Sequence, residues 1–279
     1  MPNSITDEEE LATYRKIAER YEREKDYGRK AISINQRIID EDDRDTAAYI
    51  RLAKCYMLKE SWVFALEQYL KVLSYEKNTI AKKGVKEIDS KLKTCDLAVE
   101  IAKDSSRRRL IEISIEARRQ GFNELAKAIL SRIIAKRPDE TYALNTLGGV
   151  YRHDGELDKA KNVYEKSYKI NSNITSQIGL AAVERDSGNY PAALKRYDGV
   201  LCKEPSNAYA LNGLGGVHAD MGHMADAEKC FSAAYKIEEG RKDATDGLIR
   251  LSNMYRERND SQSAERIKLL VEHLRMQFM

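Results

Sequence analysis

The chain has 279 residues, of which 33% are charged and 42% hydrophobic, and its formal net charge is +3. This balance is typical of a folded protein with a charged surface and argues against a disordered chain. No apolar run reaches the length of a membrane-spanning helix, and the acidic N-terminus lacks the apolar core of a signal peptide. The four cysteines form no CxxC pair. We therefore expect a cytoplasmic (intracellular) protein with no membrane partner.

Two small-residue markers recur along the chain with a period near 34 residues. The first is an alanine, found at Ala31, Ala65, Ala126, Ala160, Ala193, Ala227 and Ala264. The second lies 12 or 13 residues earlier, at Ala18, Ala53, Ser114, Gly148, Ala181, Gly215 and Ser252. Because both markers share one period, with a single longer step of 61 residues, the chain is predicted to be built from repeats.

Other residue types keep the same register. An aromatic residue follows the alanine by four places at Tyr69, Tyr164, Tyr197 and Phe231. A glycine lies between the two markers at Gly121, Gly155, Gly188 and Gly222, and a proline ends two repeats, at Pro138 and Pro205. This pattern resembles the tetratricopeptide repeat family over roughly residues 11 to 276. The pentatricopeptide family, which reads RNA bases, has a similar helical pair but fits these small, aromatic and proline positions less well.

The resemblance implies an all-α fold: a right-handed superhelical solenoid of about seven antiparallel helix pairs. In chain order, residues 1–78 are expected to hold the N-terminal repeats. Residues 79–106 account for the long step and are expected to form an inserted helix or a degenerate repeat. Residues 107–279 are expected to form the main array, ending in a C-terminal helix.

The 79–106 segment carries one amphipathic stripe and begins a basic stretch. The apolar residues are spaced by three and four places, at Ala81, Val85, Ile88, Leu92, Cys95, Val99 and Ala102. Residues 77–137 hold 16 Lys and Arg against 8 Asp and Glu, a net charge of +8. The clusters within it are predicted to form a basic patch of Arg107, Arg108, Arg109, Arg118 and Arg119. Such a patch would dock an acidic partner, and the lack of stacking aromatics beside the arginines argues against nucleic acid.

The main array contains two almost identical strings, YALNTLGGV at 142–150 and YALNGLGGV at 209–217. In the resembled family the first helix of each repeat lines a concave groove, and its positions 2, 5, 9 and 12 form one stripe. This stripe gives the candidate peptide-binding residues Tyr142, Asn145, Gly149, Arg152, Thr175, Ile178, Arg185, Tyr209, Asn212 and Gly216, and Gly213, at position 6 beside the stripe, is added to them. Asn would bind a ligand backbone and Arg a ligand carboxylate. Gly213 and Gly216 are predicted to leave a bare backbone floor for the ligand.

Motifs of catalysis are missing from the sequence, which has no GxxxxGK[ST], HExxH, GxSxG or GxGxxG. His218, Asp220 and His223 cluster within one repeat, but His218 stands where other repeats have tyrosine and is expected to pack. We therefore expect no enzyme activity, no cofactor and no metal.

The last helix is rich in apolar residues, namely Leu269, Leu270, Val271, Leu274, Met276, Phe278 and Met279. Solenoid ends usually carry a polar face, so this helix is expected to dock on a second copy or a partner. The predicted function is a non-catalytic scaffold or adaptor that binds a peptide or helix of a partner protein in the groove. The alternative is a regulatory subunit that docks an acidic partner or nucleic-acid machinery through residues 77–137.

Overall fold

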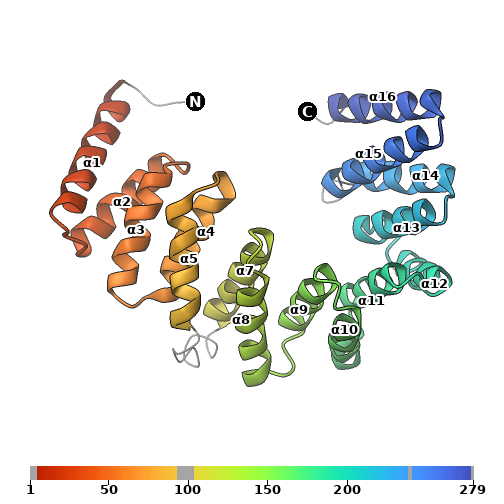
Figure 1. Ribbon diagram of the computed structural model, residues 1–279, viewed down its shortest axis with the longest axis horizontal. Coiled ribbons are helices and arrows are strands. Elements are labelled where there is room, and N and C mark those ends of the chain that lie inside the picture. Colours follow the sequence, from red (N-terminus) through yellow and green to blue (C-terminus); the bar gives the residue numbers. More distant parts are fainter. Residues whose placement is uncertain (1–4, 93–103, 238–240, 278–279) are drawn as a thin grey trace. The chain divides into compact units, whose positions relative to one another are not determined.

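The structure is a computed structural model that describes residues 5–92, 104–237 and 241–277. These residues form fifteen helices and no strand, so the chain is an all-α repeat solenoid, as predicted. The chain divides into two compact units, residues 1–138 and 139–279 (Figure 1). The predicted borders at 78 and 106 both fall inside the first unit. None of the helices in the described part of the chain has both the length and the apolar character needed to cross a membrane.

The first unit contains the helices up to Lys136, which are α1 (Ile5–Arg23), α2 (Arg29–Glu41), α3 (Thr46–Leu58), α4 (Trp62–Tyr75), α5 (Thr79–Leu92), α7 (Asp104–Arg119) and α8 (Asn123–Lys136). The second unit contains the remaining helices, which are α9 (Thr141–His153), α10 (Leu157–Asn171), α11 (Ile174–Asp186), α12 (Tyr190–Leu201), α13 (Ala208–Asp220), α14 (Met224–Tyr235), α15 (Arg241–Glu257) and α16 (Ser261–Gln277).

Helices pack in consecutive pairs within each unit, for example α9 with α10 and α13 with α14 (Figure 1). The second helix of one pair also packs against the first helix of the next, as α10 does with α11 and α12 with α13. First helices of adjacent pairs touch as well, so α9, α11, α13 and α15 form one continuous layer in the second unit. This layer carries the predicted groove residues.

All fourteen marker residues are buried, which confirms the predicted period. Small first-helix residues allow the two helices of a pair to pack closely: a Cβ added to Gly148 or Gly215 would lie within 3.0 Å of the ring of Tyr164 or Phe231 on the second helix. Side-chain caps fix the starts of several first helices. Asn173 accepts a hydrogen bond from the backbone N–H of Ser176, and Asn207 accepts one from that of Ala210.

The turn inside each pair has a residue with positive φ, seven places after the first-helix marker. Gly121, Gly155, Gly188 and Gly222 have φ values of 75 to 80°, as expected for the predicted turn glycines. The three pairs without a glycine use Lys25, Glu60 and Asn259, with φ values of 54, 55 and 61°. The turn geometry is therefore shared by all seven pairs in the described part of the chain, although only four of them show it in the sequence.

Helix α5 occupies the position of a first helix. It packs on α4, and its Gly84 lies against the ring of Tyr69, just as Gly179 lies against Tyr164. The predicted stripe residues Ala81, Val85, Ile88 and Leu92 are buried. Cys95, Val99 and Ala102 lie outside the described residues.

The C-terminal helix α16 uses part of its apolar face within its own unit. Val271 and Leu274 are buried in the core, and Leu270 packs against that core. Leu269 and Met276 are exposed. Phe278 and Met279 lie outside the described residues. The apolar face predicted for docking is therefore smaller than the sequence suggested, because Val271 and Leu274 already have partners.

Candidate functional site: the inner groove of the second unit

A hollow of about 310 Å³ lies on the layer of first helices in the second unit. We call this hollow the inner groove. Residues of four first helices line it, together with the aromatic rings of Tyr197 and Phe231 from two second helices. The lining residues are Arg152, Ile178, Ala182, Arg185, Tyr197, Tyr209, Asn212, Gly213, Gly216, Phe231, Asp243, Gly247 and Arg250. Seven of the eleven residues predicted from the sequence are among them. The structure thus brings together residues from three repeats that the sequence analysis had selected separately.

Four of the predicted residues do not line the inner groove, namely Tyr142, Asn145, Gly149 and Thr175. Asn145 is held by its neighbour, because its Nδ2 donates a hydrogen bond to Oδ1 of Asn173, 3.2 Å away. Asn173 in turn caps α11, so this amide links consecutive first helices. One hydrogen of the Asn145 amide is therefore used in a contact between repeats, and its role in binding a ligand backbone stays a prediction.

Other side chains of the chain fill the space next to the glycines of the inner groove. A Cβ placed on Gly213 would lie within 3.0 Å of the Tyr197 ring, and one on Gly216 would lie as close to the Arg185 guanidinium. Gly247 has the same relation to the ring of Phe231. The prediction of a bare backbone floor is wrong, because the floor consists of these rings and the guanidinium packed against the glycines.

The arginines of the inner groove form ion pairs along the layer of first helices. Arg152 Nη1 lies 2.9 Å from Asp186 Oδ2 on the next first helix. Arg185 Nε lies 2.6 Å from Asp220 Oδ2, and Arg250 Nη2 lies 2.5 Å from Asp220 Oδ1. Arg152 and Arg185 were predicted to pair with a ligand carboxylate, whereas the structure gives each of them a carboxylate of the adjacent repeat.

These pairs leave Arg185 and Asp220 firmly charged. Burial alone would raise the pKa of Asp220, but its hydrogen bonds and charge contacts with Arg185 and Arg250 hold that pKa below its usual value. Burial alone would lower the pKa of Arg185, and Asp220 outweighs this effect and raises it. Burial raises the pKa of Tyr197 to about 12, so its hydroxyl is neutral. The inner groove therefore has charged walls whose charges largely cancel.

The apolar surface of the inner groove comes from Ile178 and Tyr209. Tyr209 is the most exposed of the predicted aromatics, with 55% of its surface accessible, and Tyr142 at the same position of an earlier repeat is 44% exposed. Only Tyr209 lines the hollow. An arrangement of neutralised charges around an exposed tyrosine and an isoleucine suits an apolar or aromatic side chain.

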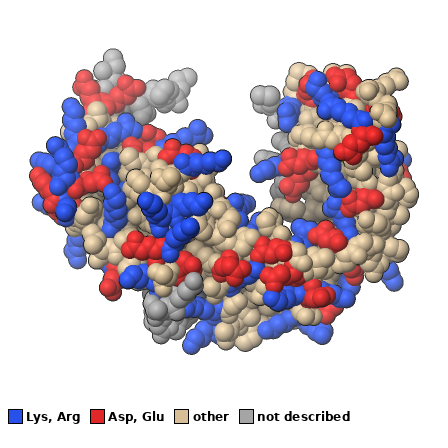
Figure 2. Space-filling view, in the orientation of Figure 1, with Lys and Arg blue, Asp and Glu red and all other residues tan. Residues whose placement is uncertain are grey.

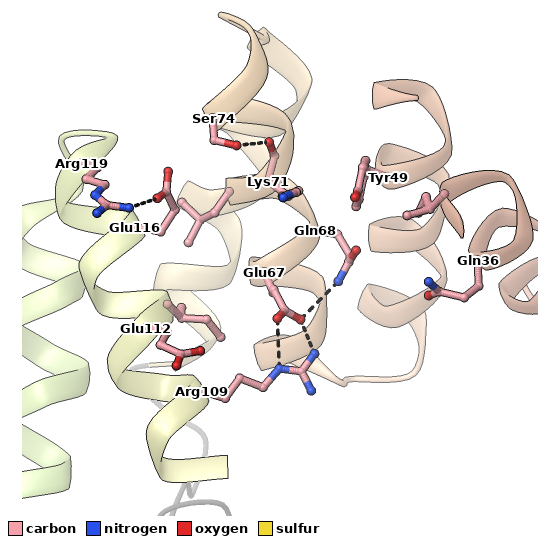
Figure 3. Close-up of a pocket in the computed structure, with 13 residues that line it drawn as sticks. Gln36, Tyr49, Glu67, Gln68, Lys71, Ser74, Arg109, Glu112, Glu116 and Arg119 are labelled. Carbon is pink, nitrogen blue, oxygen red and sulfur yellow. Dashed lines mark hydrogen bonds and ion pairs between the residues drawn. The ribbon is translucent and has the colours of Figure 1, made fainter. Parts of the chain in front are cut away.

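A larger hollow of about 630 Å³, which was not predicted from the sequence, lies in the first unit (Figure 3). Residues of α2, α3, α4 and α7 line it, and six of them are charged: Glu67, Lys71, Arg109, Glu112, Glu116 and Arg119. Glu67 and Arg109 meet across it from α4 and α7, with Arg109 Nε 3.2 Å from Glu67 Oε1. Acidic and basic side chains are equal in number here, so the lining of this hollow has no formal net charge.

The predicted basic patch does not form one basic surface. Arg107 is only 7% exposed, and Arg109 is bound to Glu67 and stacked 4.1 Å above the ring of Phe64. Arg119 pairs with Glu116 at 3.4 Å. On the face seen in Figure 2, acidic and basic groups of the first unit are interspersed. Two of the five arginines are therefore paired with glutamates, Arg109 with Glu67 of α4 and Arg119 with Glu116 one helical turn away.

Comparison with known proteins supports the repeat assignment. Residues 112–173 and 178–245 match the family model described as "Tetratricopeptide repeat". Cellulose synthase operon protein C of Pseudomonas fluorescens (strain SBW25) is 27% identical over 126 residues, which cover 44% of this chain and 10% of that protein. The match thus spans a small part of this relative.

The chain also matches solved structures of low sequence identity. MamA 41-end from Desulfovibrio magneticus RS-1 is 19% identical, with a TM-score of 0.45, over 61% of this chain and 96% of its own. A tetratricopeptide repeat protein from Parabacteroides merdae ATCC 43184 is 14% identical, with a TM-score of 0.46, over 95% of this chain and 98% of its own. The family match, together with the buried markers, shows that this chain carries tetratricopeptide repeats over residues 112–173 and 178–245.

Proposed function

We propose that this chain is a protein-interaction scaffold and that its inner groove binds an extended segment of a partner protein. Tetratricopeptide repeat proteins are generally non-catalytic scaffolds, and the family match supports the scaffold role. The observation that carries the proposal is the inner groove itself, where Ile178 and Tyr209 present apolar surface beside paired charges. Its volume, about 310 Å³, is at the lower end for ligand pockets and suits one or two side chains of a peptide.

The chemistry of the walls favours an apolar anchor over a charged one. The guanidinium groups of Arg152 and Arg185 already have carboxylate partners, so an acidic ligand would have to break an existing pair. An apolar or aromatic side chain would gain contact with Tyr209 and Ile178 without that cost. We therefore expect the bound segment to insert a large apolar side chain next to Tyr209.

A peptide library panned on the full chain tests this proposal. Selected peptides should share an apolar or aromatic residue, and Tyr209→Ala should weaken their binding at least tenfold, which is about 1.4 kcal/mol. Tyr142→Ala is the matched control, because Tyr142 has the same repeat position and similar exposure but lies outside the inner groove. Equal affinities of wild type and Tyr209→Ala would contradict the proposal.

Salt dependence separates this site from docking through charged side chains. If apolar contacts dominate binding, the dissociation constant of the peptide should change less than about threefold between 50 and 300 mM salt, because screening acts mainly on exposed charges. A steep loss of affinity over this range would favour docking through the basic 77–137 segment. Arg108→Glu, at an exposed arginine of that segment, should leave peptide affinity unchanged.

A further inference from the structure

The turn between α13 and α14 brings two histidines and an aspartate together. His218 lies near the end of α13, His223 precedes α14, and Asp226 is in its first turn. One ligand atom from each of the three side chains lies within 4.8 Å of the other two. The positive φ of Gly222, 79°, makes the tight turn that places His223 beside His218. Asp220, which the sequence analysis grouped with these histidines, instead faces Arg185 and Arg250.

His218 has a nitrogen that the surrounding protein leaves unused. Its Nδ1 is buried and has no hydrogen-bond partner among the described residues. A buried polar atom without a partner costs about 1–3 kcal/mol, and a water molecule, an ion or a ligand can supply the missing partner. Three residues after the first-helix marker, other pairs of this chain have Tyr21, Tyr56, Tyr151 and Tyr255 at this position. Packing at this position therefore does not require histidine.

We propose that His218, His223 and Asp226 bind a divalent transition-metal ion of the zinc class. Two imidazole nitrogens and one carboxylate oxygen form a ligand set suited to Zn²⁺, whereas Mg²⁺ and Ca²⁺ prefer oxygen ligands throughout. Three protein ligands leave the fourth tetrahedral position for water or for a side chain of a bound partner. The ion would tie α13, which carries Tyr209 and Gly213 of the inner groove, to α14.

The geometry needs only a small adjustment to close around an ion. Zinc–ligand distances of about 2.0–2.2 Å require the three donor atoms to move closer together than 4.8 Å. His223 and Asp226 are exposed and can rotate toward the more buried His218. Asp226 presently pairs with Lys229 Nζ at 3.1 Å, and that lysine side chain is 77% exposed. An exposed pair of this kind contributes little, so the ion can replace the lysine.

Titration of the metal-free full chain with Zn²⁺ by calorimetry, and with Co²⁺ by visible absorption, tests the proposal. A Cys202→Ser background removes an exposed thiol that could also bind metal. We expect one ion per chain, with a dissociation constant of about 10 μM or tighter. The Co²⁺ spectrum should show the intense bands of a tetrahedral site, and added Zn²⁺ should abolish them.

Variants assign the ligands. His223→Ala and Asp226→Asn change exposed side chains and should each weaken binding at least about tenfold. His218→Tyr installs the residue found in the other pairs, so it should fold and lose binding to a similar extent. His153→Ala, at an exposed histidine outside the cluster, should bind as the wild type does. The absence of one-to-one binding below about 100 μM, or equal binding by the wild type and all three ligand variants, would overturn the proposal.

Discussion

The ring of Tyr197 fills the space that a side chain on Gly213 would need. Tyr197 belongs to the second helix of one pair and Gly213 to the first helix of the next, and a Cβ on Gly213 would lie within 3.0 Å of the ring. Tyr69 with Gly84, Tyr164 with Gly179 and Phe231 with Gly247 repeat this relationship. An aromatic ring set against a glycine is therefore the recurring contact between adjacent helix pairs.

Replacing Gly213 by alanine should destabilise the second unit. The added methyl group must displace a buried ring, which costs about 1–3 kcal/mol, and the helix propensity of alanine returns about 1 kcal/mol. Gly199→Ala is the control, because a Cβ there meets nothing within 4 Å and should stabilise the helix. Urea unfolding should place the two variants about 1–3 kcal/mol apart, because both gain the helix propensity of alanine and only Gly213→Ala displaces a ring. Equal free energies of unfolding for the two variants would show that packing of the Tyr197 ring does not require glycine at position 213.

Gly149 and Gly216 occupy the same position of the two nearly identical strings, yet alanine should affect them differently. A Cβ on Gly149 would lie 3.5 Å from the Tyr164 hydroxyl, an ordinary contact, so Gly149→Ala should stabilise the protein by up to about 1 kcal/mol. A Cβ on Gly216 would meet the Arg185 guanidinium and push it from Asp220, so Gly216→Ala should gain nothing.

The Arg185→Ala background checks this explanation by denaturant unfolding. With the guanidinium removed, Gly216→Ala should recover the helix-propensity gain of about 1 kcal/mol, as a double-mutant cycle would show. Additive effects of the two substitutions would mean that Arg185 is not what makes Gly216 necessary.

The fold could be predicted from the sequence because small residues are required wherever two helices cross closely. Those positions repeat at a fixed period and are all buried. The turn was only partly predictable. Its left-handed backbone conformation is supplied by glycine in four pairs, but Lys25, Glu60 and Asn259 adopt it in the others at a modest cost. Non-glycine residues in this conformation cannot be recognised as turn positions from the sequence.

The inner groove was harder to predict because the partners of its residues come from neighbouring repeats. The register within one repeat identified Gly213 and Arg185 as groove residues. It did not identify their partners, which are the Tyr197 ring packed against Gly213 and the Asp220 carboxylate paired with Arg185. A signal was present, since each interface glycine follows its aromatic residue by 15 or 16 places. Where Asn35 replaces the aromatic, the residue 16 places on is Arg51, and its Nε donates to Asn35 Oδ1 at 2.9 Å.

Removing the carboxylate of Asp220 should cost more stability than removing that of Asp186. The Asp220 side chain is 17% exposed and serves two arginines, whereas Asp186 is 33% exposed and serves one. Asp220→Ala leaves the partly buried Arg185 without its carboxylate, so a loss of about 1–3 kcal/mol is expected. Asp186→Ala should cost about 0.5 kcal/mol, typical of an exposed pair. Denaturant unfolding in the presence of EDTA would compare them without metal, and equal losses would contradict the unequal burial.

Alkaline pH should destabilise the second unit through Tyr197. Burial raises its pKa from near 10 to about 12, so the folded state holds the phenolic proton at a pH where the unfolded state releases it. The stability from this neutral hydroxyl is complete below pH 10 and is lost as the pH rises toward 12, with about 1.4 kcal/mol gone at pH 11.

Tyr197→Phe isolates this contribution. Phe231 occupies the equivalent position of the next pair, so phenylalanine fits the site. Urea unfolding at pH 8 and pH 11 should show a smaller alkaline loss for the variant than for the wild type, by about 1.4 kcal/mol. Tyr49 and Tyr69 of the first unit, whose pKa values burial also raises to about 12, are present in both proteins and cancel in the comparison. Equal losses would show that the Tyr197 hydroxyl titrates as it does in the unfolded chain.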